Sequence, residues 1–259
     1  MTEPTIVIEE LTYRIRKATL ISEIDLDVVP GQVVAVIGPN GAGKSTLLGL
    51  VAGNLHPTQG TVHLNGINTS QALPGELALV RSVLTQTGSS DVPYTSAQVV
   101  SMGRFPHRRD EANTRERDES TISLAMAQTD TLQFANRPYT TLSKGEQARV
   151  ALARVIAQAA PIVLLDEPTT ALDVAHQERV LKLIVELSRE GKTVLVVLHD
   201  LNAAAVYAGR VVLMNQGEIV ADGTPREVLL AGLLTEVYQQ PLTVVDHPFR
   251  DCPLVLPGD

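Results

Sequence analysis

Cysteine and aromatic residues are scarce in this sequence. Its 259 residues include a single cysteine, Cys252, no tryptophan, three phenylalanines and five tyrosines. One cysteine excludes an internal disulfide framework and is typical of a reducing compartment. The few aromatic rings leave little material on which nucleic-acid bases could stack, and the net charge of −8 disfavours a broad nucleic-acid footprint. We therefore expect no nucleic acid among the partners.

Long hydrophobic runs are lacking as well. The most hydrophobic stretch, residues 193–198, ends at His199 and falls well short of the roughly 18 apolar residues of a membrane span. The first ten residues contain three glutamates and no basic residue, which does not fit the start of a secretory signal. The sequence therefore predicts a chain that stays in the cytoplasm and has no membrane-spanning segment of its own.

What the sequence does contain is enough apolar material for a sizeable core. Hydrophobic residues make up 44% of the chain, which favours one compact domain with a subdomain. β-like runs come first, helical periodicity follows, and from Ile162 strands and helices alternate, as in a parallel sheet covered on both faces. The predicted strands are residues 6–8, 24–29, 33–37, 61–64, 80–84, 162–165 and 193–198, with a hairpin over 211–215 and 218–222. The predicted helices are residues 47–53, 96–103, 114–128, 150–157, 174–190 and one that starts at Leu201; no pattern is evident after Pro241.

A glycine-rich segment, Gly-Pro-Asn-Gly-Ala-Gly-Lys-Ser-Thr, directly follows the apolar run Val33–Ile37 and precedes a helical stretch. This is the context of a phosphate-binding loop. Glycines let backbone N–H groups wrap phosphates at a helix N-terminus, Lys44 neutralises the outer phosphates, and the Ser45 hydroxyl can ligate Mg²⁺. An ordinary glycine-rich turn is the alternative, which the flanking strand and helix disfavour. The predicted nucleotide-binding residues are Gly38, Pro39, Asn40, Gly41, Ala42, Gly43, Lys44, Ser45 and Thr46.

Two adjacent carboxylates, Asp166 and Glu167, end the apolar run that begins at Ile162. Parallel sheets place their ligand sites at this end of a strand. We expect Asp166 to hold Mg²⁺, directly or through water, and Glu167 to polarise a water in line with the γ-phosphate. A solvated turn is the alternative, which loses weight beside a phosphate-binding loop.

Between these two elements lies the segment Leu-Ser-Lys-Gly-Glu-Gln, residues 142–147. By itself it is a plausible helix start, in which Ser143 caps the helix and Glu146 completes a capping box. Together with the other two elements, it resembles the signature of the ATP-binding cassette (ABC) family. Both interpretations stay open from the sequence.

The resemblance to the ABC family extends over nearly the whole chain and implies an α/β fold. The expected fold is the ABC-type nucleotide-binding domain, which has a RecA-like parallel-sheet core, an antiparallel β subdomain and an inserted α-helical subdomain. The resemblance implies a single domain over residues 1–259. Within it, the nucleotide-binding core is expected at residues 1–86 and 159–259 and the helical subdomain at 87–158. The resemblance also implies that the chain hydrolyses ATP, with Mg²⁺, to drive transport.

The resemblance further assigns roles to single residues. Tyr13 matches the aromatic residue that stacks on adenine, and Gln86 matches a glutamine that senses Mg²⁺ and nucleotide. His199, after a predicted strand, matches the switch histidine for the γ-phosphate, and residues 171–173 match the loop that touches the opposite subunit. The implied catalytic residues are Glu167, His199 and Gln86, and the implied metal ligands are Ser45, Gln86 and Asp166.

In this family two copies of the chain form a head-to-tail dimer. Ser143 and Gly145 of one copy close on the γ-phosphate that Lys44 of the other holds, and Glu146 belongs to the same binding segment. The N-terminus of a helix suits this role because its N–H groups and dipole attract an anion. Lys144 departs from the family, which usually has glycine there; a lysine could add attraction for phosphate or crowd the backbone approach.

The stretch from Gln86 to Arg108 resembles the ATPases of importers for iron chelates, haem and vitamin B12, and Gly103-Arg104-x-Pro106-His107 is similar to the haem-import group. The implied function is to power uptake of haem or a ferric chelate from the cytoplasmic face of the membrane. The implied partners are a second copy, two integral-membrane permease subunits and a substrate-binding protein. Siderophore or vitamin B12 as cargo, and a soluble ABC scaffold such as one in iron–sulfur cluster assembly, are the alternatives.

Overall fold

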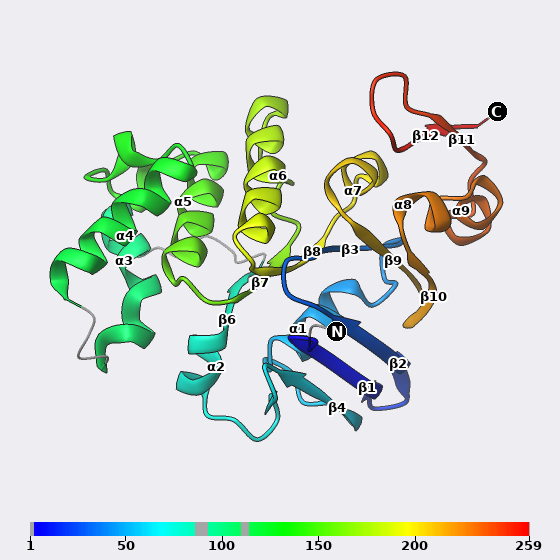
Figure 1. Ribbon diagram of the computed structural model, residues 1–259, viewed down its shortest axis with the longest axis horizontal. Helices are drawn as coiled ribbons and strands as arrows, with labels where there is room; N and C mark the ends of the chain where they lie inside the picture. Colours follow the sequence, from blue (N-terminus) through cyan, green and yellow to red (C-terminus); the bar gives the residue numbers. More distant parts are fainter. Residues whose placement is uncertain (1–2, 86–92, 110–113, 259) are drawn as a thin grey trace.

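A six-stranded sheet forms the centre of the protein, whose computed structural model describes residues 3–85, 93–109 and 114–258 (Figure 1). The strand order is β10-β9-β3-β8-β7-β6, and all neighbours are parallel except β10 and β9. Along β3, Val33, Ala35 and Ile37 pack into one core and Val34 and Val36 into another. Because successive side chains of a strand point to opposite faces, both faces are covered, as predicted. The strands are β3 (Val33–Ile37), β6 (Arg81–Leu84), β7 (Ile162–Asp166), β8 (Thr193–Val197), β9 (Arg210–Asn215) and β10 (Glu218–Gly223).

A second, antiparallel sheet in the order β2-β1-β4-β5 packs on one of these cores. Its first two strands are much longer than predicted. The pairing of β1 with β2 shifts register after Ile8 and again after Leu11, and Glu10 and Glu23 adopt positive φ angles of 47° and 49°. Such bulges break the alternation of apolar and polar residues, so the sequence pattern hides the continuation of the strand. The bounds are β1 (Ile6–Ile15), β2 (Ala18–Val28), β4 (Gln59–Leu64) and β5 (Ile67–Asn68).

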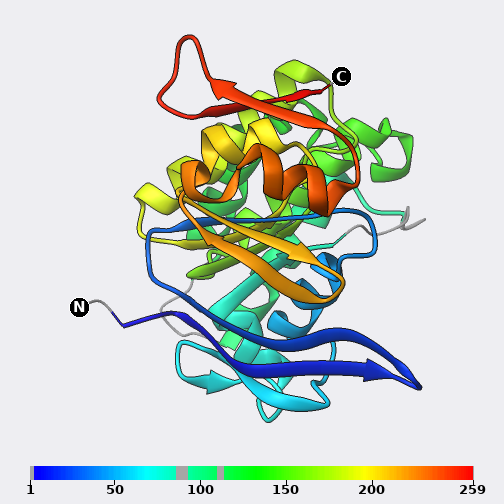
Figure 2. The ribbon, with the colours of Figure 1, turned by 90° about the vertical axis from the view of Figure 1, so that its right-hand side faces the viewer.

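Helices cover the central sheet on both sides. α1 (Lys44–Val51) contacts β2 and β4 of the antiparallel sheet as well as β7 and β8, so it lies between the two sheets. α6 (Val174–Arg189) and α7 (Leu201–Tyr207) contact β3 on the opposite face. Figure 2 shows the resulting layers edge on, with β1 and β2 at one end and the C-terminal hairpin at the other. The α/β fold class predicted from the sequence is confirmed.

A separate group of helices lies beside the sheet, at the left of Figure 1. α3, α4 and α5 share a core of their own, which includes Val100, Met126 and Val150. The helix predicted to end at Gly103 instead ends at Ser101, because a 3₁₀ segment that contains Pro106 follows it. The bounds are α2 (Pro74–Val80), α3 (Ser96–Ser101), η1 (Met102–Arg109), α4 (Arg115–Gln128), η2 (Leu132–Phe134), η3 (Tyr139–Thr141) and α5 (Lys144–Ala157).

The C-terminal region forms structure that the sequence pattern did not reveal. After α8 (Pro225–Val228) and α9 (Ala231–Tyr238), the chain makes an antiparallel hairpin of β11 (Leu242–Asp246) and β12 (Pro253–Pro257). The Asn202 side chain of α7 binds the hairpin through the backbone of Val255, accepting from its N–H at 2.7 Å and donating to its carbonyl at 3.0 Å. In the part of the chain that is described, no helix has the length and apolar character to cross a membrane.

Candidate functional site

The loop between β3 and α1 has a backbone shape that requires glycine. Gly38, Gly41 and Gly43 have φ angles of 147°, 81° and 101°, a region that other residues rarely adopt. A Cβ atom on Gly38 would lie 2.2 Å from the carbonyl oxygen of Met214, so even a methyl group does not fit there. Gly43 occupies the cap of α1 without a side chain, which leaves the start of the helix accessible from the loop.

The side chain of Lys44 folds back over this loop and is 6% exposed. Its ammonium donates to the carbonyl oxygens of Gly38 at 2.8 Å and Pro39 at 2.9 Å. Burial lowers the pKa of Lys44, and the nearby carboxylates of Glu167 and Asp166 oppose that shift. The loop therefore holds a cation whose charge is only partly compensated by its surroundings.

The two carboxylates at the end of β7 face the loop. The hydroxyl of Ser45 donates to Asp166 Oδ1 at 3.1 Å, which joins the first turn of α1 to the strand. Burial raises the pKa of Asp166, and the bond from Ser45 partly offsets this. A hydroxyl and a carboxylate are oxygen ligands of the kind that Mg²⁺ prefers.

Glu167 is held in an uncommon backbone conformation, with φ of 50°. Thr170 donates to its Oε2 at 3.1 Å, and the ring of His199 contacts its Oε1. Two neighbours from different segments thus fix the direction of the Glu167 side chain. Backbone strain of this type costs about 1–3 kcal/mol and is concentrated at functional sites.

Lys44, Ser45, Glu167 and His199 line one cavity of about 280 Å³, whereas Asp166 is linked to it through Ser45. The walls of the cavity come from the loop and first turn of α1, from the end of β7 and from His199, so it brings together residues that are far apart in the sequence. Leu20 of β2 also lines it and was not predicted, since a leucine in a strand carries no sign of a ligand contact. The lining residues are Leu20, Asn40, Gly41, Ala42, Gly43, Lys44, Ser45, Thr46, Glu167 and His199.

Besides the signature residues, four predicted residues that the structure describes do not line this cavity: Gly38, Pro39, Asp166 and Tyr13. Tyr13 lies on β1 opposite Ile21 and packs, half-buried, against the core under the antiparallel sheet. Gln86 lies outside the described residues. Arg104, in the segment similar to the haem-import group, is buried, with its guanidinium 2.6 Å from Asp118 and bound to the Ala157 carbonyl.

The predicted signature residues form the start of α5. Ser143 Oγ accepts from the Glu146 N–H at 3.3 Å, and Glu146 Oε2 accepts from the Ser143 N–H at 2.7 Å, which is a complete capping box. This second bond lowers the pKa of Glu146. Ser143 and Lys144 are exposed, and a Cβ atom on Gly145 would lie 3.0 Å from the Ala171 carbonyl. The helix-start interpretation is therefore correct, and the exposed start of α5 is also compatible with the signature interpretation.

The chain is similar to known proteins over most of its length. The model of the family described as "ABC transporter" matches residues 21–170. The hemin import ATP-binding protein HmuV of Nocardia farcinica is 49% identical, in a match that covers 92% of this chain and 82% of that protein. An inward-facing structure of a metal-chelate type ABC transporter has a TM-score of 0.84 at 27% identity, in a match that covers 100% of this chain and 98% of the transporter chain. A dimeric ATP-binding cassette bound to ADP and phosphate has a TM-score of 0.75 at 28% identity, in a match that covers 85% of this chain and 98% of that cassette.

Proposed function

The chain belongs to the ABC transporter family, and from that premise we propose that it powers the uptake of haem through separate membrane subunits. It is an ATP-binding protein of the type that hydrolyses ATP to drive transport. The cavity lined by Lys44, Ser45 and Glu167, with Asp166 bonded to Ser45 at its edge, is the observation that carries the proposed mechanism. Haem as cargo is supported by the hemin import relative, and a metal chelate is the broader class named for the structural neighbour.

The outer phosphates of ATP would bind in the loop, at the start of α1 and beside Lys44. Ser45 and Asp166 would hold Mg²⁺, which, when bound, neutralises charge on the phosphates. Two protein oxygens suffice because this ion usually takes its other ligands from phosphate and water. Tyr13 would stack on adenine, and Gln86, which lies outside the described residues, would be a further ligand of Mg²⁺.

Glu167 would act as the general base for hydrolysis. A water bound between its carboxylate and the γ-phosphate forms the new P–O bond while the bond to the ADP oxygen breaks, and Glu167 accepts the proton of the water. Thr170 and His199 support this role because they hold the carboxylate at the cavity wall. His199 is also placed to sense the γ-phosphate, since its ring lines the same cavity.

The site would be completed by a second copy of the chain. Ser143, Gly145 and Glu146 do not contribute to the lining of the 280 Å³ cavity in their own subunit, as far as the structure is described. The start of α5 is exposed and can meet a phosphate from outside, so a head-to-tail pair would place it on the partner's ATP. The dimeric cassette among the structural neighbours supports this arrangement.

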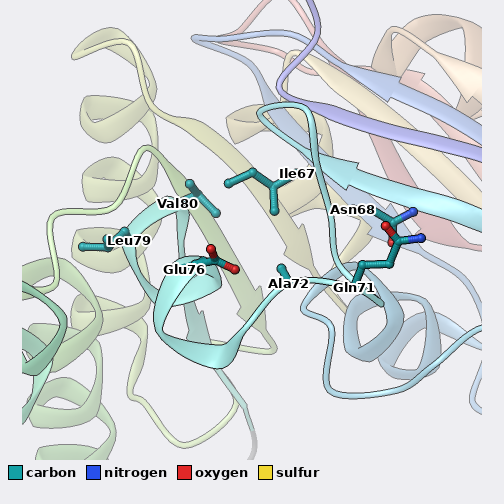
Figure 3. A pocket seen from close by; sticks show the side chains of 7 residues that line it. All are labelled: Ile67, Asn68, Gln71, Ala72, Glu76, Leu79 and Val80. Atoms are coloured by element: carbon teal, nitrogen blue, oxygen red, sulfur yellow. The ribbon is translucent and has the colours of Figure 1, made fainter.

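An apolar surface around η1 is suited to the membrane subunits. Phe105 is 67% exposed and Met102 41%, and α2, which packs against η1, presents Leu79 at 47% exposure. Leu79 also borders a hollow of about 440 Å³ in which Ile67 and Val80 face each other (Figure 3). Exposed apolar patches of this kind are typical of protein interfaces. We place the two permease subunits here, at the cytoplasmic face of the membrane, with a substrate-binding protein delivering cargo on the other side.

Purification of the tagged chain from detergent-solubilised cells tests this function. We expect multi-span membrane proteins to copurify, and haem delivered by a substrate-binding protein to stimulate ATP hydrolysis by the complex, with no stimulation in a Glu167→Gln complex. Phe105→Ala should weaken recovery of the membrane proteins, whereas Leu124→Ala, at a similarly exposed position on α4, should not. Membrane partners without a haem response would exclude haem as cargo, and exclusively soluble partners would overturn the importer.

A further inference from the structure

Asp130, in the turn after α4, joins two helices that belong to different parts of the fold. Its carboxylate Oδ2 accepts from Arg149 of α5 at 3.0 Å and from Arg179 of α6 at 3.0 Å, and the ring of His176 lies 3.7 Å away. Arg149 also donates to the Asp130 backbone carbonyl at 2.8 Å. Asp130 has φ of 54°, a conformation that aspartate and asparagine tolerate better than most residues.

The two helices that Asp130 connects both begin at the surface proposed to face a second copy. α5 starts after Ser143, and α6 starts after Asp173, whose carboxylate caps it through the His176 N–H at 2.9 Å. Gln177 of α6 donates to the carbonyls of Thr169 and Leu172, which ties the preceding loop to the helix. Movement of α6 would therefore carry the 169–173 segment with it.

The two helix starts are also in direct contact with each other. Gly145 packs so closely on the Ala171 carbonyl that a Cβ atom there would lie 3.0 Å from it. This contact has no side chain on the Gly145 side, so Gly145 contributes no side-chain hydrogen bond or ion pair to it. Farther along both helices, Asp130 provides directional hydrogen bonds, because its carboxylate accepts from Arg149 of α5 and Arg179 of α6.

We propose that Asp130 is a positioning residue for ATP hydrolysis, because it locks α5 to α6 so that the signature and the 169–173 segment meet a second copy as one surface. The proposal rests on the proposed dimeric function. Arg149 is buried, and its guanidinium also lies 5.5 Å from the ring of Phe134, so the α5 side of the bridge is fixed by several contacts. Arg179 is 63% exposed, so its pairing with Asp130 adds little to stability and can be removed without unfolding the chain.

Arg179→Ala tests the bridge, and Lys182→Ala is its matched control. Lys182 lies on the same helix, is also 63% exposed and is also ion-paired, but its partner Glu178 is on α6 itself. In the full chain we expect Arg179→Ala to lower kcat about two- to fivefold, the range of an exposed ion pair. The Kd for ATP and the thermal midpoint should stay at wild-type values. ATP-dependent dimerisation of Arg179→Ala in a Glu167→Gln background should weaken by a similar factor, and Arg179→Lys should restore most of both.

A double-mutant cycle with Asp130→Asn separates positioning from general damage. Asparagine keeps the backbone conformation and an acceptor oxygen but removes the charge. If the bridge acts as proposed, Arg179→Ala causes no further loss of kcat in the Asp130→Asn background. Additive losses, or a loss in Lys182→Ala equal to that in Arg179→Ala, would overturn the bridge. Absence of ATP-dependent dimers in the Glu167→Gln chain with Asp130 and Arg179 intact would instead overturn the proposed dimeric function.

Discussion

Replacement of Lys44 by methionine should separate its proposed role in binding phosphate from any role in the fold. Its ammonium makes two charge-assisted hydrogen bonds, which contribute about 1.5–3 kcal/mol each. Removing an ammonium from water costs several kcal/mol. Burial is the main reason why the pKa of Lys44 is lowered, so the charged ammonium is disfavoured at this position. Because these effects oppose each other, we expect the free energy of unfolding of Lys44→Met without nucleotide to lie within about 1 kcal/mol of wild type.

The affinity for ATP should respond much more strongly. Loss of one member of a buried contact between opposite charges costs about 2–5 kcal/mol, so the Kd for ATP should rise about 30-fold or more. Adenosine, which has no phosphate, should bind equally to both proteins. The expected pattern is thus an intact fold with a specific loss of phosphate binding.

Urea unfolding and isothermal titration calorimetry measure the two quantities on the same preparation. Lys182→Met is a suitable control because it removes an exposed lysine far from the loop in sequence. A drop of more than about 2 kcal/mol in the stability of nucleotide-free Lys44→Met would show that Lys44 mainly serves the fold. Wild-type affinity for ATP in that variant would refute the assignment of Lys44 to the phosphates.

Two further predictions concern the loop and the start of α5. Gly38→Ala should lower the free energy of unfolding by about 2–4 kcal/mol in urea titrations, since it adds a clash with Met214 to backbone strain, whereas Gly41→Ala, with no atom near the new Cβ, should cost about 1–2 kcal/mol. A Gly38→Ala cost no larger than that of Gly41→Ala would contradict the clash. The fold lowers the pKa of Glu146 from its ordinary value of 4.5. The Glu146 carboxylate therefore stabilises the protein fully at pH values above 4.5, and this contribution is lost as the pH falls through the lowered pKa. Glu146→Gln should therefore be less stable than wild type at pH 7 and converge with it in acid, and a difference independent of pH would argue against the charge.

The parts of the site that could be predicted from the sequence are those in which the chemistry and the local backbone occur in one short segment. The phosphate loop combines glycines, Lys44 and Ser45 within nine residues, and Asp166 and Glu167 end an apolar strand. Their proximity also follows from the fold, because parallel strands end at the same edge of a sheet. The bond between Ser45 and Asp166 is the direct result of this rule.

Other features depend on contacts that no local pattern contains. Asp130 bridges helices whose arginines lie 19 and 49 residues away in the sequence, and a lone aspartate after a helix gives no sign of such partners. The bulges of β1 removed the alternation that reveals a strand. Leu20 reaches the cavity because β2 packs against the loop before α1, where the Leu20 carbonyl lies 2.9 Å from the position of a Cβ on Gly43. In the C-terminal hairpin, the Asn202 side chain bonds to the N–H and the carbonyl of Val255. It thus takes the place of the backbone groups of a neighbouring strand.

The charges around the cavity and on α5 are better explained together than separately. Burial shifts Lys44 and Asp166 toward their neutral forms, so each would gain from a ligand of opposite charge, a phosphate for one and a cation for the other. The exposed Lys144 stands in the first turn of α5, where the helix dipole disfavours a cation by a few tenths of a kcal/mol or more. An anionic phosphate presented by a second copy would turn that cost into attraction. We therefore predict that Lys144, the departure from the family pattern, is unfavourable in the isolated subunit and favourable in the proposed dimer.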